Sequence, residues 1–136
     1  MKLWIDDIRP APKDYLWCKS VNEAKECVEY FEELIEELRS QLTIRYSYHE
    51  ERQNNRINEI QNQIKQTTIT LIDLDHDAGD YANDGGDYVR LLDWFEETGR
   101  NYPIRIHSMN PVGVQNMRAI IQKNSWQEIK WEAMTI

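Results

Sequence analysis

The sequence predicts an α/β fold in which a parallel sheet carries helices on its faces. Apolar, β-branched segments alternate with amphipathic segments of helical period along the 136 residues, a pattern typical of parallel sheets. The stretch "TTITLIDLD" (67–75) is almost continuously apolar, as a strand buried on both faces should be. Two helix starts are also marked: "SVNE" (20–23) has the capping-box pattern, and "NPVG" (110–113) has Asn at the cap and Pro just inside.

Five strands are expected, and their residues are 2–5, 15–19, 67–75, 102–108 and 126–134. Helices are expected from residue 20 to about 42 and at 51–66, 87–98 and 110–124. The prolines of "RPAP" (9–12) prevent a regular helix directly after the first strand, because proline lacks an N–H and restricts the preceding residue. A loop rich in Gly and Asp should fill residues 76–87.

The first two helices are predicted to form an antiparallel hairpin. No Gly or Pro occurs from residue 20 to 66, yet one continuous helix would carry the next strand too far from the core. Apolar residues between Ala24 and Leu42 are spaced alternately by four and three, which is typical of a coiled coil, and "TIRYSYHE" (43–50) breaks the pattern. This seam is longer than the answering one at 57–64, so some of the apolar side chains toward its end should stay exposed: Leu38, Leu42, Ile44, Tyr46 and Tyr48. Exposed apolar stripes favour an interface, and we expect a homo-oligomer; the alternative is a hairpin that packs only on itself.

Composition limits the class of protein. The chain is expected to be one domain, 1–136, with the hairpin inserted at about 25–66. A net charge of −8 argues against general nucleic-acid binding and against binding to an anionic membrane surface. No apolar stretch is long enough for a membrane span, and charges inside "MKLWIDD" argue against a signal peptide. Cys18 and Cys27 form no metal or redox motif; reduced core thiols are expected, which suits a cytoplasmic protein.

Polar residues of the kinds that bind ligands or transfer protons follow three of the predicted strands. They are Asp6 and Asp7, then Asp75, His76 and Asp77, then His107, Ser108 and Asn110. Ligands of open α/β sheets bind beyond the carboxyl ends of the strands, so three such clusters predict a site there. The alternative is that these are ordinary cap and turn residues.

The layout resembles the receiver domain of response regulators. More specifically, "LWIDDIRPAP", "LDHDAGD", "DGGDYVRLLDW" and "HSMNPVGVQNMRAII" resemble its divergent branch, the cyclic-phosphate processing receiver domain. The resemblance implies a flavodoxin-like, doubly wound, five-stranded parallel sheet of order 2-1-3-4-5, here without the usual first helix. Receivers also carry a Lys at the end of the fifth strand, followed by Pro. Lys130 comes too early and no Pro follows, which argues against phosphoaspartate signalling.

The implied strand order brings Asp6, Asp7 and Asp75 together. Three carboxylates repel one another unless they share protons or a cation, and Mg²⁺ is the expected partner. His76 and His107 would then stand on adjacent strand ends, with Asp75 or Asp77 able to orient one ring. Such an imidazole pair can take a proton from water and protonate the leaving oxygen of a cyclic phosphodiester.

Phosphate-binding residues are also expected. The helix that begins at "NPVG" should offer free N–H groups at Val112, Gly113 and Val114. Arg9 is the expected source of local positive charge, ahead of Arg118. The predicted ligand-binding residues are therefore Arg9, Ser108, Asn110 and Gly113.

We therefore expect a small anionic phosphate ligand, and hydrolysis of a cyclic nucleotide, a related signal or a 2′,3′-cyclic phosphate. RNA repair, or removal of a nucleotide signal in anti-phage defence or counter-defence, would suit such chemistry. Two alternatives stay open: a module that sequesters a cyclic nucleotide without turnover, and an atypical signalling receiver.

Overall fold

Four parallel strands form the sheet. The computed structural model describes residues 1–45 and 51–130, with the side chains of 51–53 left out. The strands are β1 (Lys2–Ile5), β2 (Tyr15–Cys18), β3 (Leu71–Leu74) and β4 (Ile104–Ile106). Their order is β2-β1-β3-β4 and every neighbouring pair is parallel. The predicted parallel α/β class is confirmed.

The two faces of this sheet differ in chemistry. The register places four residues in one row across β2, β1, β3 and β4: Trp17, Trp4, Asp73 and Arg105. Because successive side chains of a strand point to opposite faces, the aliphatic neighbours of this row lie on the other face. They are Leu3, Ile5, Ile72, Leu74, Ile104 and Ile106. One face is therefore apolar, and the other carries aromatic rings and a buried charge pair.

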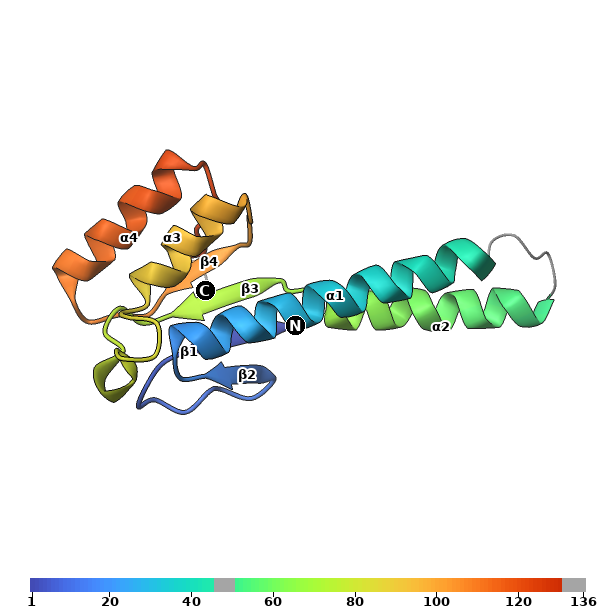
Figure 1. Cartoon of the computed structure of the whole chain (residues 1–136), viewed down its shortest axis with the longest axis horizontal. Helices are drawn as coiled ribbons and strands as arrows, with labels where there is room; N and C mark the ends of the chain where they lie inside the picture. Colours follow the sequence, from blue (N-terminus) through green and yellow to red (C-terminus); the bar gives the residue numbers. More distant parts are fainter. Residues whose placement is uncertain (46–50, 131–136) are drawn as a thin grey trace. The chain divides into compact units, whose positions relative to one another are not determined.

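The helices α3 (Val89–Thr98) and α4 (Pro111–Lys123) lie side by side (Figure 1). Right-handed crossovers that progress in one direction place both helices on one face of the sheet. Their buried side chains are apolar, so this is the apolar face: Leu91, Leu92, Phe95, Met117 and Ile121. The helix α3 ends at Gly99, whose φ of 70° is the left-handed cap conformation expected of a glycine stop.

No helix follows β1, as the prolines predict. Residues 6–14, all of which the structure describes, contain bends and turns only. Two indole N–H groups from the polar face hold this segment. Trp4 donates to the carbonyl of Arg9 at 2.9 Å, and Trp17 donates to the carbonyl of Asp6 at 2.7 Å. The loop is thus fastened to the face of the sheet that carries Asp73 and Arg105.

The fifth strand is not found in the described part of the chain. It was expected at 126–134, and residues 131–136 lie outside the described residues. Within 126–130 a single bridge joins Glu128 to Ile104, in parallel orientation. Its hydrogen bonds run from Ile104 N to the carbonyl of Gln127 and from Ile129 N to the carbonyl of Ile104. Both involve Ile104, the first residue of β4, and no other bridge joins β4 to residues 126–130.

The chain divides into two compact units, Met1–Cys27 with Ile69–Ile136, and Val28–Thr68, which we call the helical unit. The helical unit contains most of α1 (Val21–Arg45) and all of α2 (Glu51–Thr67). The predicted cap at Ser20 is confirmed, since Ser20 Oγ accepts from Glu23 N at 3.0 Å. The Glu23 carboxylate reaches back by one residue more than a capping box requires and accepts from Lys19 N at 3.2 Å. That these helices are an insertion in a compact receiver fold stays a prediction. None of the helices that the structure describes has the length and apolar character needed to cross a bilayer.

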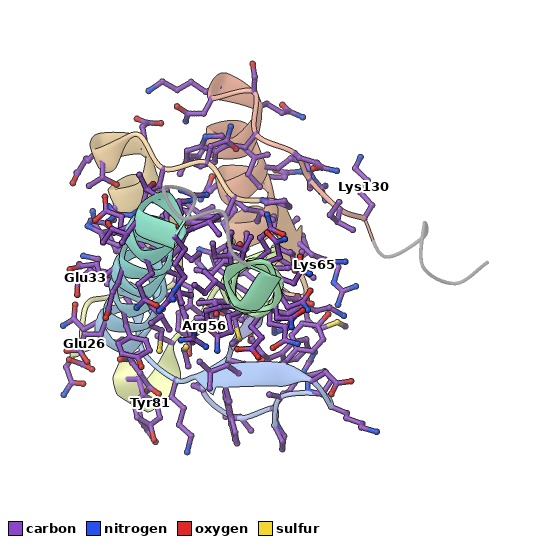
Figure 2. All side chains as sticks on the ribbon, turned by 90° about the vertical axis from the view of Figure 1, so that its right-hand side faces the viewer. Glu26, Glu33, Arg56, Lys65, Tyr81 and Lys130 are labelled. Atoms are coloured by element: carbon purple, nitrogen blue, oxygen red, sulfur yellow. The ribbon has the colours of Figure 1, made fainter. Side chains whose placement is uncertain are left out.

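Self-association through the helical unit stays a prediction, and two exposed apolar side chains support it. Tyr30 and Ile44 on α1 are 61% and 63% exposed, whereas Leu38 is buried. Tyr46 and Tyr48, which we also expected at the interface, lie outside the described residues. Replacing Tyr30 and Ile44 by Ser should lower the mass measured by light scattering from that of a dimer to that of a monomer. The same replacement at Glu33, also on α1 (Figure 2), should leave the mass unchanged; a monomeric wild type would contradict the prediction.

The two cysteines are free thiols, as expected. Cys18 is buried at the end of β2 and Cys27 lies on α1, with their sulfur atoms 3.6 Å apart. Burial raises the pKa of both thiols, so neither is a ready nucleophile at neutral pH.

Candidate functional site

The carboxyl ends of β1, β3 and β4 bring three of the predicted residues together. Backbone hydrogen bonds continue past the strand ends, from Asp75 N to the carbonyl of Ile5 and from His107 N to that of Leu74, both at 2.9 Å. As a result, one ligand atom each of Asp6, Asp75 and His107 lies within 4.8 Å of the others. The sheet edge therefore assembles a mixed cluster of two carboxylates and an imidazole.

His107 is the more enclosed of the two predicted histidines, with only 6% of its surface exposed. Its Nδ1 lies 2.7 Å from Asp73 Oδ1, and its Nε2 lies 2.9 Å from Asp6 Oδ2. The Trp4 ring stacks on the imidazole, with centroids 3.8 Å apart and an interplanar angle of 3°. A neutral imidazole donates at one nitrogen only, so two ionised partners require one further proton in this group. Both ring nitrogens of His107 thus contact carboxylates, so His107 is not a free acid or base.

Asp73 is in turn held by Arg105. Arg105 Nε donates to Asp73 Oδ2 at 2.7 Å, and Nη2 donates to the same oxygen and to the Tyr15 hydroxyl, the latter at 2.7 Å. Sequence reasoning did not assign these three residues. A signal was present, however, because an aspartate in "LIDL" and an arginine in "IRI" interrupt two otherwise buried strands. A buried charge needs a partner, and adjacent strands supply it.

Asp6 is held as a carboxylate. Its Oδ1 accepts the amides of Ile8 and Arg9 at 2.9 and 2.8 Å. Burial alone would raise the pKa of Asp6, but these two hydrogen bonds and the contact with His107 outweigh it and lower the pKa. The turn after β1 therefore fixes a negative charge beside His107.

Asp7 lies under the loop that follows β3. The loop contains the 3₁₀ helix η1 (Gly79–Tyr81), and its first residue contacts Asp7: a Cβ on Gly79 would come within 2.2 Å of Asp7 Oδ2. Burial is the main cause that raises the pKa of Asp7, and the charges of Asp6 and Asp75 raise it further. The three predicted acids are therefore close enough to repel one another.

Gly79→Ala should destabilise the protein more than Gly99→Ala does. Both glycines have positive φ, 54° and 70°, so an alanine costs about 1–2 kcal/mol of strain at either position. At Gly79 the new methyl group would also collide with the Asp7 carboxylate, whereas at Gly99 nothing lies within 4 Å. Urea unfolding of the two variants measures the difference, and equal losses would show that the loop does not rest on Asp7.

His76 and Asp77 form a second pair, at the N-terminus of α4. His76 Nδ1 lies 2.8 Å from Asp77 Oδ1, and the Asn110 side-chain amide reaches Asp77 Oδ2 at 3.4 Å. The imidazole packs on Gly113, where a Cβ would come within 2.4 Å of the ring carbon Cγ. The side chain of His76 is 15% exposed, and no residue that the structure describes is hydrogen-bonded to its Nε2. His76 is therefore the predicted histidine with an available ring nitrogen.

The expected phosphate-binding N–H groups are mostly occupied. Asn110 Oδ1 accepts from Gly113 N at 3.1 Å, and the Asn110 carbonyl accepts from Val114 N at 2.9 Å. The expectation of free N–H groups at Gly113 and Val114 was wrong, because Asn110 caps the helix itself. The glycine instead makes room for the ring of His76.

The other predicted ligand-binding residues lie around the same edge of the sheet. Ser108 Oγ accepts from Asn110 N at 3.1 Å, which shapes the turn into α4. Arg9 is exposed, and its Nη1 reaches the carbonyl of His107 at 3.5 Å. The guanidinium of Arg9 thus lies close to the end of β4, where a positive charge can meet an anionic ligand.

Two basic residues lie outside this cluster. Arg118 pairs with Glu128, with Nη2 and Oε2 2.8 Å apart, which agrees with its lower ranking as a ligand residue. Lys130 is exposed and lies well away from Tyr81 of the loop over Asp7 (Figure 2). Lys130 therefore does not lie beside this loop.

A family model described as "Cyclic-phosphate processing Receiver domain" matches residues 1–42 and 46–123. The chain belongs to this family. The residues that match the model of the cyclic-phosphate processing receiver domain include every candidate site residue. They also include α1 and α2, apart from residues 43–45. No match was found among the curated proteins or among the solved structures. Family membership links this fold to the processing of cyclic phosphates.

Proposed function

We propose that this receiver-like protein binds a small cyclic phosphate ester at the carboxyl edge of its sheet and hydrolyses it. The observation that carries the proposal is the His76–Asp77 pair, whose imidazole has an available Nε2 beside the acid cluster. Suitable substrates are a cyclic nucleotide, a related signal or a 2′,3′-cyclic phosphate. Such a reaction would serve RNA end repair or the clearance of a nucleotide signal.

In this proposal His76 is the proton-transfer group. Asp77 accepts a hydrogen bond from Nδ1, so the proton of a neutral ring lies on Nδ1 and the lone pair lies on Nε2. His76 takes a proton from water as the water oxygen forms its bond to phosphorus. The ester P–O bond breaks, the leaving oxygen receives a proton, and the product is a phosphomonoester with a free hydroxyl group.

The remaining residues would bind and orient the ligand. Arg9 supplies positive charge near the end of β4, while Ser108 and Asn110 shape the turn on which the phosphate would lie. Asp6, Asp7 and Asp75 are the expected holders of a divalent cation, which would draw charge from the phosphate oxygens when bound. We assign His107 a positioning role instead of the acid–base role expected at first, because both of its ring nitrogens contact carboxylates.

His76→Ala should lower the hydrolysis rate by about 10²–10⁴-fold, the contribution typical of a general base, without changing the melting temperature. The measurement is chromatography of a panel of cyclic nucleotides and 2′,3′-cyclic phosphates incubated with and without Mg²⁺. Lys123→Ala, at the other end of α4, is the matched control and should keep the wild-type rate. A His76→Ala variant with an unchanged rate would contradict the proposed role.

A further inference from the structure

We propose that the cluster at the sheet edge takes a divalent transition-metal ion through Nε2 of His107, together with Asp6 and Asp75. This inference deepens the proposed function by naming the class of cation, and it depends on that function only for the location of the site. Three ligand atoms, one from each residue, already lie within 4.8 Å of one another. An ion that accepts an imidazole nitrogen is therefore expected to bind at this edge, and Mg²⁺ is expected to bind more weakly.

The first argument is the geometry of His107 and Asp6. Their facing atoms, Nε2 and Oδ2, are 2.9 Å apart. Two ligands bound at about 2.1 Å to one ion lie at a similar separation, so an ion can replace the proton between them without a large movement. Asp75, which is half-buried, completes the set with the carboxylate that follows β3.

The second argument is the support behind the ring. Histidines that bind metals usually donate their other ring N–H to a carboxylate, which fixes the orientation of the ring. His107 has this arrangement, because its Nδ1 lies 2.7 Å from Asp73 Oδ1. Arg105 holds Asp73 in turn, with Nε and Oδ2 2.7 Å apart, and the Trp4 ring stacks on the imidazole. Asp73, Arg105 and Trp4 thus fix the orientation of the His107 ring, a support that a metal-binding histidine needs and that a cluster of carboxylates alone would not require.

The third argument is the choice of ion. Mg²⁺ prefers oxygen ligands and keeps several waters, whereas imidazole suits ions such as Zn²⁺, Fe²⁺ and Ni²⁺. The ligands here are one imidazole nitrogen, from His107, and two carboxylates, and Trp4 covers one face of the His107 ring. This set suits the ions that accept imidazole better than it suits Mg²⁺. The cation is therefore expected to differ from the one that a cluster of carboxylates alone would favour.

The test uses Co²⁺ as the probe with the full-length chain. Titration should give one equivalent of bound Co²⁺ by visible absorption, and excess Mg²⁺ should not displace it. In the proton NMR spectrum of the Co²⁺ form, one hyperfine-shifted exchangeable signal is expected from the Nδ1–H of His107. This signal should exchange slowly in D₂O, because the group is buried against Asp73.

Two variants that leave Trp4, Asp73 and Arg105 unchanged complete the experiment. Asp75→Asn removes a proposed ligand and should weaken Co²⁺ binding at least tenfold. Asp77→Asn changes a nearby carboxylate outside the cluster and should leave the affinity unchanged. Failure to bind Co²⁺, displacement by Mg²⁺, absence of the shifted N–H signal or equal effects of the two variants would each overturn the inference. None of these readouts requires turnover. A protein that does not hydrolyse cyclic phosphates could therefore still bind Co²⁺, and a protein that does not bind Co²⁺ could still hydrolyse them.

Discussion

Arg105→Met is expected to lower the free energy of unfolding by about 3–5 kcal/mol, the cost typical of removing one partner of a buried ion pair. Arg105 and Asp73 are both buried, and Arg105 donates to Asp73 through Nε at 2.7 Å. Without the guanidinium, His107 would be the one hydrogen-bond partner left to the Asp73 carboxylate among the residues that the structure describes. Urea unfolding followed by tryptophan fluorescence measures the loss.

Arg118→Met is the matched control. Its guanidinium also pairs with a carboxylate, that of Glu128, but its side chain is 37% exposed. Water screens such a pair, so a loss of about 1 kcal/mol or less is expected. If the two variants lost the same stability, the row of charged side chains across the polar face would not be the support that we describe.

Gly113→Ala is expected to reduce the proposed hydrolysis about 10²-fold, the size of effect that a displacement of about 1 Å can have on a reacting group. A methyl group at this position would lie 2.4 Å from His76 Cγ, so the imidazole must move away from the start of α4. Stability should change little, because alanine favours a helix by about 0.5–1 kcal/mol over glycine and offsets part of the crowding. Steady-state kinetics and thermal unfolding of the same samples separate the two effects.

Val112→Ala is the control, since this neighbouring side chain is 67% exposed and its shortening leaves the ring of His76 untouched. Its rate should match that of the wild type. A Gly113→Ala variant that is as active as Val112→Ala would show that the position of His76 does not matter for the reaction.

The parts of the fold that could be predicted are those with local signals. The buried strand β3 has a continuous apolar run, α1 begins after the cap at Ser20, and "RPAP" excludes a helix after β1. The fifth strand stays a prediction, because only the parallel bridge between Glu128 and Ile104 joins residues 126–130 to β4, and residues 131–134 lie outside the described residues.

The candidate site was predicted in part. Strand ends placed Asp6, Asp75 and His107 at one edge, since that follows from topology alone. The sequence could not predict that His107 is enclosed while His76 keeps an available ring nitrogen. His107 is enclosed because its side chain lies on the same face of the sheet as Asp73 and Arg105 and contacts Asp73. Likewise, the use of Gly113 N by Asn110 is a matter of side-chain rotamer, which spacing in the sequence does not fix.

The proposed hydrolysis is tested most directly by ³¹P NMR of a cyclic phosphate panel incubated with the wild-type protein in H₂¹⁸O. Attack by water on phosphorus predicts a phosphomonoester that contains one ¹⁸O, with its signal shifted relative to the product formed in ordinary water. The product should form with the wild type and not with His76→Ala. Perturbation of a ligand signal by binding, with no product from any member of the panel, would contradict hydrolysis and favour a module that sequesters its ligand.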